Sequence, residues 1–323
     1  MLRPWQARSS EYHPYMVDSV DALPATLAVS ARAALPPDAG AARAFYVPRD
    51  YRARGWTNAR QTPEQALIFT DGGVLYVQGQ AKGIEPYKEP GKELGKDYAG
   101  GERAPMFVRP GTLLYMCSSH LLLYGRLEFV SALDRQAVKL DMDFNAVGWR
   151  LMDAEWRGLV GKIVDLPPLP PDALLRESEH EQELLEDLPP KFSFGLRKYG
   201  LYTGEILHGA IFQPPIWDKH WALFPKQLTA NTLLALTNAS VIVIDEDRAL
   251  VRKSQQYGYR ITRIPRHAIA GVAAADVNGL HELTFTLARA GAESERRWML
   301  EPQTVEQWLA LWETHNSPGT PPA

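Results

Sequence analysis

The stretch LLALTNASVIVIDE, residues 233–246, joins an apolar run to a β-branched run through the break Thr-Asn-Ala-Ser. Two such runs around a short polar break are typical of antiparallel strands joined by a tight turn. Residues 66–78 read ALIFTDGGVLYVQ and follow the same pattern. Aligning Thr70 with Thr237 (237 − 70 = 167) brings the apolar positions of the two stretches into register. The sequence therefore predicts that one β-hairpin occurs twice.

The alignment extends toward the N-terminus without a gap. Residues 42–48 (ARAFYVP) match residues 210–215 (AIFQPP), with Phe45 on Phe212 and a proline near the end of both. Proline has no N–H to donate to a neighbouring strand, so it favours the end of a strand. In each copy we predict a strand, then a long polar and aromatic loop, then the hairpin.

Beyond the hairpin the two copies differ in length. Residues 79–112 are rich in glycine, proline, lysine and glutamate, which indicates an exposed loop inserted in the first copy. Residues 137–144 (AVKLDMDF) then match residues 282–289 (ELTFTLAR) at a smaller offset, 282 − 137 = 145. The two offsets differ by 167 − 145 = 22, which predicts 22 extra residues in the first copy. The alternation of apolar residues in 137–144 predicts a half-buried strand.

Each copy is predicted to end with a strand and an amphipathic helix. Residues 148–152 (GWRLM) match residues 297–300 (RWML), with Trp149 on Trp298, and are expected to form the last strand. Apolar residues then recur at helical spacing, i, i+3, i+4 and i+7, which marks one buried face. These residues are Trp156, Leu159, Val160 and Ile163 in the first copy and Val305, Trp308, Leu309 and Trp312 in the second.

The repeat divides the chain into five parts. The segment between the copies is acidic and bounded by prolines, which predicts a solvated helix over residues 176–187 that acts as a spacer. The predicted parts are an N-terminal leader with a helix at 18–35 (1–35), a first domain with the inserted loop (36–164), a linker (165–197), a second domain (198–315) and a disordered tail (316–323).

Composition sets further limits. At 323 residues and 36.2 kDa, with 45% hydrophobic residues, the chain has enough apolar material for two domains with cores. Its net charge of −3 argues against a surface built as a whole for nucleic acid or an anionic membrane. Cys117 is the only cysteine, so neither an intrachain disulfide nor a cysteine-based zinc cage can form. The sequence has no signal-peptide pattern or apolar run of membrane-spanning length, and we expect a soluble, cytoplasmic protein.

Both copies resemble the pleckstrin-homology (PH)-like domain, particularly its bacterial versions. The resemblance lies in the hairpin at 236–245, the segment IPRHAIAGV at 264–272 and the helix with Trp308 and Trp312. It implies a mainly β (α+β) fold in which each copy has about seven antiparallel strands in two near-orthogonal sheets, with a C-terminal helix that covers one end of a partly open barrel. The first copy departs from this pattern at 118–130, where no Ile-Pro element occurs.

An arginine-rich loop follows the first strand of the first copy and is the first candidate site. It carries Arg49, Arg52, Arg54 and Trp56. PH domains that hold phosphoinositides place basic residues in this region, and Arg43 together with Arg52 and Arg54 resembles their spacing. Guanidinium groups bind phosphate through two parallel hydrogen bonds, so the loop is a candidate site for an anionic ligand. The alternative is a solvated loop whose arginines pair with acids.

The matching loop of the second copy is rich in tryptophan and is the second candidate site. It carries Trp217, Lys219, His220 and Trp221. Exposed aromatic side chains in a loop favour a protein interface. Aromatic residues that fold back over the domain are the alternative.

Patterns that would indicate catalysis or a cofactor are weak. Residues 89–97 (EPGKELGKD) have the wrong glycine spacing for a phosphate-binding loop. Cys117 and His120 could act as a nucleophile and a base, but no third residue is placed to orient them, and a buried inert thiol is the alternative. We therefore predict no catalytic residue, no metal site, no cofactor and no enzymatic activity.

The sequence favours a non-enzymatic binding or scaffold protein of tandem PH-like domains that interacts with another protein or with itself. The alternative is a module that binds an anionic ligand, such as a phosphate group or the surface of a phospholipid membrane, through the arginine-rich loop. Nucleic acid is not expected among its partners.

Overall fold

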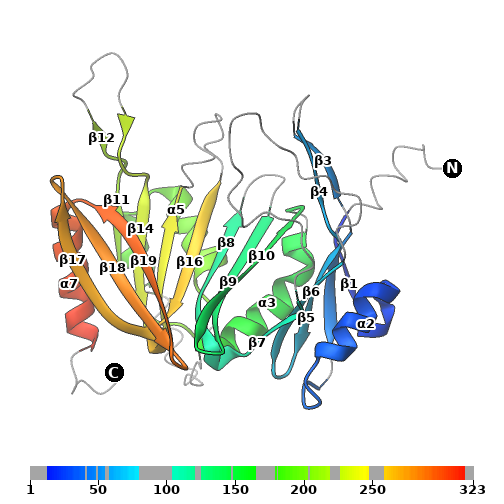
Figure 1. The fold of residues 1–323 in the computed structure, drawn as a ribbon. Helices are drawn as coiled ribbons and strands as arrows, with labels where there is room; N and C mark the ends of the chain where they lie inside the picture. Colours follow the sequence, from blue (N-terminus) through cyan, green and yellow to red (C-terminus); the bar gives the residue numbers. More distant parts are fainter. Residues whose placement is uncertain are drawn as a thin grey trace. The chain divides into compact units, whose positions relative to one another are not determined.

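The computed structural model describes residues 13–40, 42–48, 50–54, 58–79, 104–120, 125–146, 148–164, 179, 181–202, 204–218, 226–246 and 258–316 (Figure 1). For 50–54, 58–62 and 226 it describes the backbone alone. The described residues group into two compact units. Unit one comprises the residues up to Pro110 together with Gly125 and residues 142–159, and unit two comprises the others.

Unit one is built on an antiparallel five-stranded sheet with the strand order β1-β2-β5-β6-β7. Its elements are β1 (Tyr15–Val17), η1 (Val20–Ala22), α2 (Ala25–Ala34), β2 (Arg43–Val47), β3 (Asp50–Arg54), β4 (Asn58–Thr62), β5 (Gln65–Thr70), β6 (Gly73–Gln78) and β7 (Met106–Val108). Helix α2 forms inside the predicted range 18–35 and places Leu27 against Ile68 and Leu75 on one face of the sheet.

The other face of this sheet packs against aromatic residues around the start of α3 (Gly148–Val164). The ring of Phe144 contacts Phe45 at 5.4 Å and Trp149 at 5.0 Å between centroids. Gly148 fits between Phe45 and Phe144, because a Cβ there would lie 2.6 Å from the Phe45 ring. The predicted last strand at 148–152 is therefore wrong: these residues form the first turn and more of α3.

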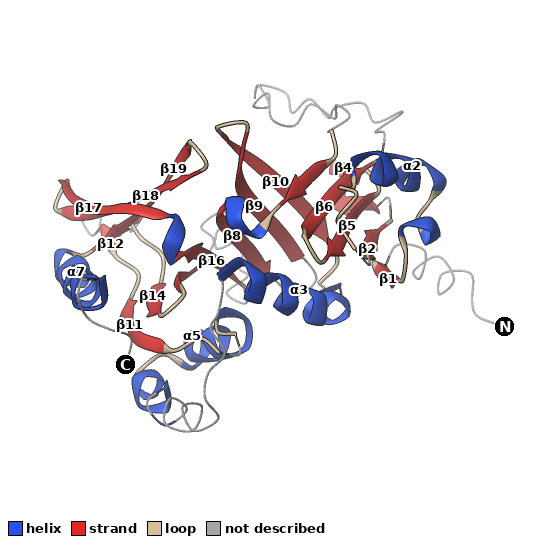
Figure 2. Ribbon diagram, turned by 90° about the horizontal axis from the view of Figure 1, so that it is seen from below, coloured by secondary structure: helices blue, strands red, loops and turns tan. Residues whose placement is uncertain are grey.

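Unit two contains a three-stranded sheet, β17-β18-β19, and, apart from the end residues of β9 and β10 that group with unit one, an antiparallel seven-stranded sheet with the order β10-β9-β8-β16-β15-β14-β11 (Figure 2). The elements are η4 (Pro110–Thr112), β8 (Leu113–His120), β9 (Gly125–Leu133), β10 (Gln136–Phe144), α5 (Pro190–Gly195), η5 (Leu196–Gly200), β11 (Leu207–Gln213), β12 (Trp217–Asp218), β13 (Lys226–Gln227), β14 (Thr232–Thr237), β15 (Ser240–Asp245), β16 (Tyr259–Pro265), η6 (Arg266–Ala268), β17 (Ile269–Val277), β18 (Leu280–Arg289), β19 (Ala292–Leu300) and α7 (Pro302–Asn316).

Strands β14 and β15 are buried on both faces. Leu234 and Val243 face a core that includes Trp308 of α7, whereas Leu233 and Ile244 face a second core formed with α5 and η5. A strand covered on both sides needs apolar residues at every position, which explains the continuous apolar runs of 233–246.

The duplicated hairpin is confirmed residue by residue. Strands β5 and β6 pair Leu67 with Tyr76, and β14 and β15 pair Leu234 with Val243, each at an offset of 234 − 67 = 167. The threonine at the turn acts alike in both copies. Thr70 Oγ1 donates to the Gly73 carbonyl at 3.0 Å, and Thr237 Oγ1 donates to the Ser240 carbonyl at 3.1 Å.

The second half of the repeat has a different offset from the predicted one. Strand β10 ends at Phe144 and β19 at Leu300, so the offset is 300 − 144 = 156. The turns before these strands agree, since Arg135 and Gly291 both have positive φ at the same offset. The first copy is thus longer by 167 − 156 = 11 residues rather than 22, and the match of 137–144 to 282–289 is one strand out of register.

Apart from β1 and the two-stranded ribbons β3–β4 and β12–β13, the described residues of both copies form four antiparallel strands, then three more, then a helix. The strands are β2, β5, β6, β7, β8, β9 and β10 before α3, and β11, β14, β15, β16, β17, β18 and β19 before α7. The predicted mainly β class with a C-terminal helix is confirmed. Among the described strands, no sheet closes into a barrel.

The contacts divide the chain differently from the repeat. Strand β8 belongs to the first copy by sequence, yet it pairs with β16 of the second copy, and Figure 1 shows the two side by side. Residues 111–120 and 126–141 consequently group with unit two. The predicted spacer helix is not simply solvated, because Leu185 is buried in the same core as Phe192.

Candidate functional site

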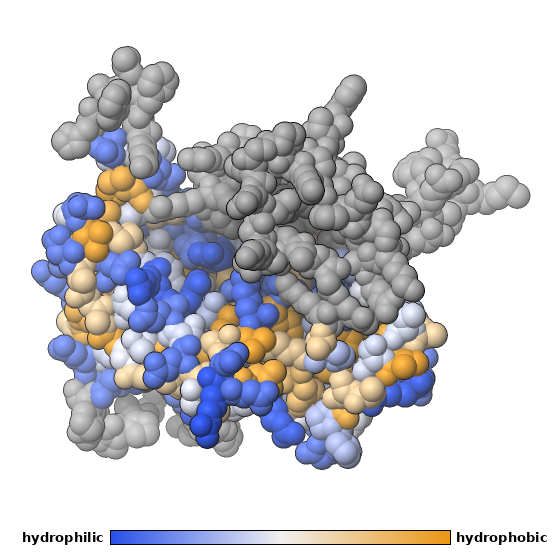
Figure 3. Space-filling model, in the orientation of Figure 1, coloured by the Kyte–Doolittle hydropathy of each residue, from blue (hydrophilic) through white to orange (hydrophobic). Residues whose placement is uncertain are grey.

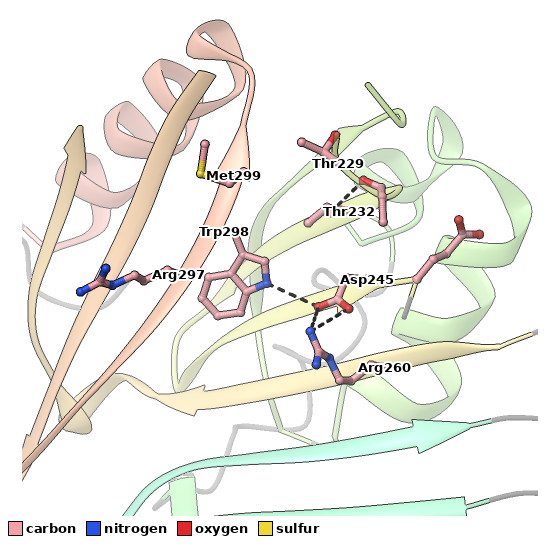
Figure 4. Close-up of a pocket in the computed structure, with 9 residues that line it drawn as sticks. Thr229, Thr232, Asp245, Arg260, Arg297, Trp298 and Met299 are labelled. Carbon is pink, nitrogen blue, oxygen red and sulfur yellow. Dashed lines mark hydrogen bonds and ion pairs between the residues drawn. The ribbon is translucent and has the colours of Figure 1, made fainter. Parts of the chain in front are cut away.

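A pocket of about 340 Å³ lies in unit two, where β14 begins, β15 ends and β19 passes over them (Figure 4). We call it the unit-two pocket. Its lining residues are Thr229, Ala230, Thr232, Asp245, Glu246, Arg260, Arg297, Trp298 and Met299. Strand alternation turns Trp298 toward Asp245, while Arg297 points away from it (Figure 4).

A buried carboxylate organises the pocket. Asp245, 5% exposed, accepts a hydrogen bond from Arg260 at 3.1 Å and one from the indole Nε1 of Trp298 at 3.4 Å. A carboxylate can remain charged in such a place only if a cation and hydrogen-bond donors surround it. Asp245 therefore fixes the orientation of Arg260 and Trp298, and Trp298 forms an apolar wall with one polar edge.

The remaining charge at the pocket is also compensated. Glu246 accepts hydrogen bonds from Lys191 at 2.6 Å and from Asn231 at 2.7 Å. Thr232 donates its hydroxyl to the Ala230 carbonyl, which leaves its oxygen oriented as an acceptor. The pocket thus combines paired charges, hydroxyl groups and one aromatic wall. No cluster of three or more potential metal ligands occurs in the part of the chain that the structure describes.

Trp217 lies on a two-stranded ribbon that begins at the pocket wall. Strand β12 pairs Trp217 with Gln227 of β13. At the base of the ribbon, the Ile216 amide donates to the hydroxyl of Thr229, a lining residue, at 3.1 Å. Trp217 is 46% exposed, which fits the interface reading of the tryptophan-rich loop better than one in which Trp217 folds back. The other candidates of this loop, Lys219, His220 and Trp221, lie outside the described residues.

The arginine-rich segment is also a two-stranded ribbon, β3 and β4, and not the predicted loop. The backbone register places Arg52 directly opposite Arg60. Arg54 lies opposite Asn58, while Arg49 and Trp56 lie outside the described residues. Since this ribbon belongs to unit one, the two sets of sequence-predicted residues are not brought together in the unit-two pocket.

Cys117 and His120 of β8 are not a catalytic pair. Burial raises the pKa of Cys117 to about 12, so the thiolate that a nucleophile requires is absent at neutral pH. Burial, helped by nearby Lys198, lowers the pKa of His120 to about 3, and its ring stacks on Tyr199 at 4.2 Å. The alternative of a buried inert thiol is therefore the one that the structure supports.

Sequence reasoning missed Asp245, Arg260 and Trp298. The structural alignment of the two copies places Gln78 of the first copy on Asp245, at an offset of 245 − 78 = 167. It places Ala104 on Arg260 and Met142 on Trp298, at an offset of 260 − 104 = 298 − 142 = 156. A correct alignment of the two copies would have indicated these pocket residues, because charged and aromatic residues in the second copy replace different residue types in the first. The signal was lost because the predicted alignment places Trp298 on Trp149, at an offset of 298 − 149 = 149, and not on Met142.

Comparisons with protein families, curated proteins and solved structures find no match to this chain. Within the described residues, no helix is both long and apolar enough to cross a membrane.

Proposed function

We propose that the chain is a non-enzymatic binding protein made of two PH-like modules and that the unit-two pocket holds a segment of a partner protein. The observation that carries this proposal is the exposed Trp217 on a ribbon that begins at a wall of that pocket. The order of four strands, three strands and a helix in both copies supports the PH-like assignment.

The chemistry of the pocket suits a polypeptide. Tryptophan and arginine are enriched among the residues that contribute most to protein interfaces, and they act best where surrounding contacts exclude water. Hydroxyl groups such as that of Thr232 can bind backbone amides of a partner, while Trp298 and Met299 offer apolar surface. On the described surface drawn in Figure 3, hydrophilic and apolar side chains are interspersed, as in interfaces that form and dissociate.

A site-specific cross-linking experiment tests this proposal. A photo-reactive amino acid at Met299, in the pocket wall, is expected to capture a defined partner in cells, and the same group at exposed Ala310 of α7 is not. With the purified partner, Trp217→Ala should weaken binding about 30-fold, the effect of a residue central to an interface. Equal capture at Met299 and Ala310, or binding unchanged by Trp217→Ala, would refute the proposal.

A second candidate function is the binding of an anionic ligand by the β3–β4 ribbon. The observation that favours it is the register that sets Arg52 opposite Arg60, since like charges directly across a ladder are unfavourable unless an anion compensates them. Binding to vesicles with anionic lipid, or to inorganic phosphate, should fall steeply with salt and disappear in an Arg52→Glu/Arg54→Glu variant. Binding that is insensitive to both salt and these substitutions would exclude it.

A further inference from the structure

Strands β8 and β17 occupy the same place in the two copies but have opposite environments. They begin at Leu113 and Ile269, again 269 − 113 = 156 residues apart. Seven of the eight residues of β8 are buried, and β8 has a neighbouring strand on each side, β9 and β16. The last five residues of β17, by contrast, are exposed, and among the described strands β17 pairs with β18 alone.

The edge of β17 has little protection against pairing. Proteins usually guard an exposed edge with charged residues, proline or a bulge. In β17 a bulge occurs only near Ile269, and the first charged residue is Asp276, close to the end of the strand. Between them lie Ala273, Ala274 and Ala275, small residues that let another backbone approach closely.

The complementary edge exists in unit one. Strand β7 has the place in the first copy that β16 has in the second, since Val108 pairs with Val74 as Ile264 pairs with Val241 (264 − 108 = 156). Strand β7 is the last strand of the five-stranded sheet, and in the described part of the chain it pairs with β6 alone. Among the described strands, β8 and β16 thus form one completed junction of this type. The edges of β7 and β17 are the two halves of a second such junction, and within the described part of the chain they do not pair with each other.

We propose that β17 of one molecule pairs antiparallel with β7 of a second copy of this chain, in the register of the β8–β16 junction. This inference rests on the proposed function in that self-association is one form of the protein binding assigned to the tandem modules. The pair Arg260–Ser119 within the chain corresponds to Ala104 and Ala275 between molecules (260 − 104 = 275 − 119 = 156). Ala104 and Ala275 are both exposed, so a second molecule can reach them.

The geometry of the junction sets the form of the assembly. Two different surfaces meet, so a dimer joined by one junction has one edge of each kind left over, and growth continues head to tail beyond a dimer. The new junction is weaker than its internal counterpart, because Pro105 takes the place of Ile261 and has no N–H to donate. Association should therefore appear at high protein concentration and reverse on dilution.

Disulfide trapping tests both the pairing and its register. In a Cys117→Ser background, an Ala104→Cys protein is mixed with an Ala275→Cys protein that carries a fusion tag to change its mass. Antiparallel partners have Cα atoms about 4.5–5.5 Å apart, within the range that a disulfide spans. The mixed disulfide should form at least several-fold faster than with Asp276→Cys, one residue out of register. A disulfide dimer of Ala275→Cys alone would show symmetric β17–β17 pairing and overturn the proposal, as would the absence of any mixed product.

Sedimentation velocity supplies an independent readout without cysteines. The average mass of the wild type should rise with concentration beyond that of two copies, and Ala273→Lys/Ala275→Lys should keep the protein monomeric by charging the edge. Gln303→Lys/Ala310→Lys adds the same charge on exposed positions of α7 and should assemble as the wild type does. A wild type that stays monomeric, or lysines at 273 and 275 without effect, would refute this pairing. Trp217→Ala should not alter assembly, so partner binding and self-association can fail separately.

Discussion

The two copies share a hairpin and differ in what is attached to it. In the second copy, Ser240 at the turn donates to the carboxylate of Glu205, the hydroxyl oxygen of Thr237 lies 2.9 Å from the same carboxylate oxygen, and Arg263 donates to that oxygen at 2.5 Å. Arg263 also lies 4.5 Å from the centre of the Tyr202 ring. In the first copy the corresponding positions hold Asp38, Phe107 and Gly73, and of this network only the threonine bond within the turn remains.

The hairpin is therefore a scaffold common to both copies, and the residues around it make each copy different. In unit two a buried ion pair secures the segment before β11 to the sheet, whereas in unit one the apolar helix α2 covers the sheet. The same holds at the strand edges, where β8 is enclosed and β17 is exposed. Substitutions at matched positions of the two copies can therefore test how far their surroundings differ.

The largest expected difference is in thiol reactivity at matched positions of β8 and β17. Cys117 corresponds to Ala273 (273 − 117 = 156), and burial keeps the pKa of Cys117 near 12. Cys117 should react with a thiol reagent only on opening of the structure, more than about 1,000-fold slower than a cysteine placed at 273 in a Cys117→Ser background. Reagent uptake followed by absorbance measures both rates. Similar rates would mean that the two strands are equally accessible.

Removal of the buried carboxylate of Glu205 should destabilise unit two strongly. Glu205→Gln leaves Arg263, 3% exposed, without its counter-ion, and we expect a loss of about 3–5 kcal/mol in the free energy of unfolding. The matched change in the first copy, Asp38→Asn, affects an exposed residue and should stay within about 0.5 kcal/mol. Urea denaturation compares the two variants. Equal effects would argue that the ion pair does not distinguish the copies.

Acid should weaken unit two through His120, whose position in the second copy holds the exposed Asp276. Burial, then Lys198, lowers the pKa of His120 from 6.5 to about 3, so between these values the unfolded chain binds a proton that the folded chain does not. Stability is retained above pH 6.5 and falls as the pH decreases toward 3. From pH 7 to pH 5 the wild type should lose about 2 kcal/mol more than His120→Phe. Denaturation curves at both pH values that shift equally in the two proteins would contradict this assignment.

The smallest expected effect concerns the unit-two pocket. Asp245→Gln installs the residue that the first copy has at this place, Gln78, and removes the partner of Arg260 and Trp298. Because Arg260 is partly exposed, the cost should be about 1 kcal/mol, with a larger loss of cross-linking at Met299. The reverse change, Gln78→Asp, meets Ala104 in place of an arginine and should stay within about 0.5 kcal/mol. Thermal denaturation and the capture yield of each variant provide the comparison.

The hairpins could be predicted from the sequence because their signal is local: two apolar runs, a turn and a threonine at fixed spacing. The end of the first copy could not, since Trp149 and Leu151 fit a strand alternation only briefly, whereas Trp149, Met152 and Trp156 follow the three- and four-residue spacing of α3. Pocket residues Asp245 and Trp298 are 298 − 245 = 53 positions apart, and no local pattern indicates such a pair. The strand that pairs with β8 could not be predicted either, because β16 is distant in sequence and no local pattern indicates the pairing.

The pairing of β8 with β16 also sets an order of events during synthesis. His120 and Tyr259 are partners separated by 259 − 120 = 139 residues. At a translation rate of roughly 5–20 residues per second, β8 leaves the ribosome on the order of 10 s before its partner strand exists. During that interval the edge of β8 that pairs with β16 in the folded protein has no partner strand. Neighbouring nascent chains on one messenger RNA would offer strands for that edge, so slow initiation, which spaces the ribosomes apart, should raise the yield of correctly paired protein.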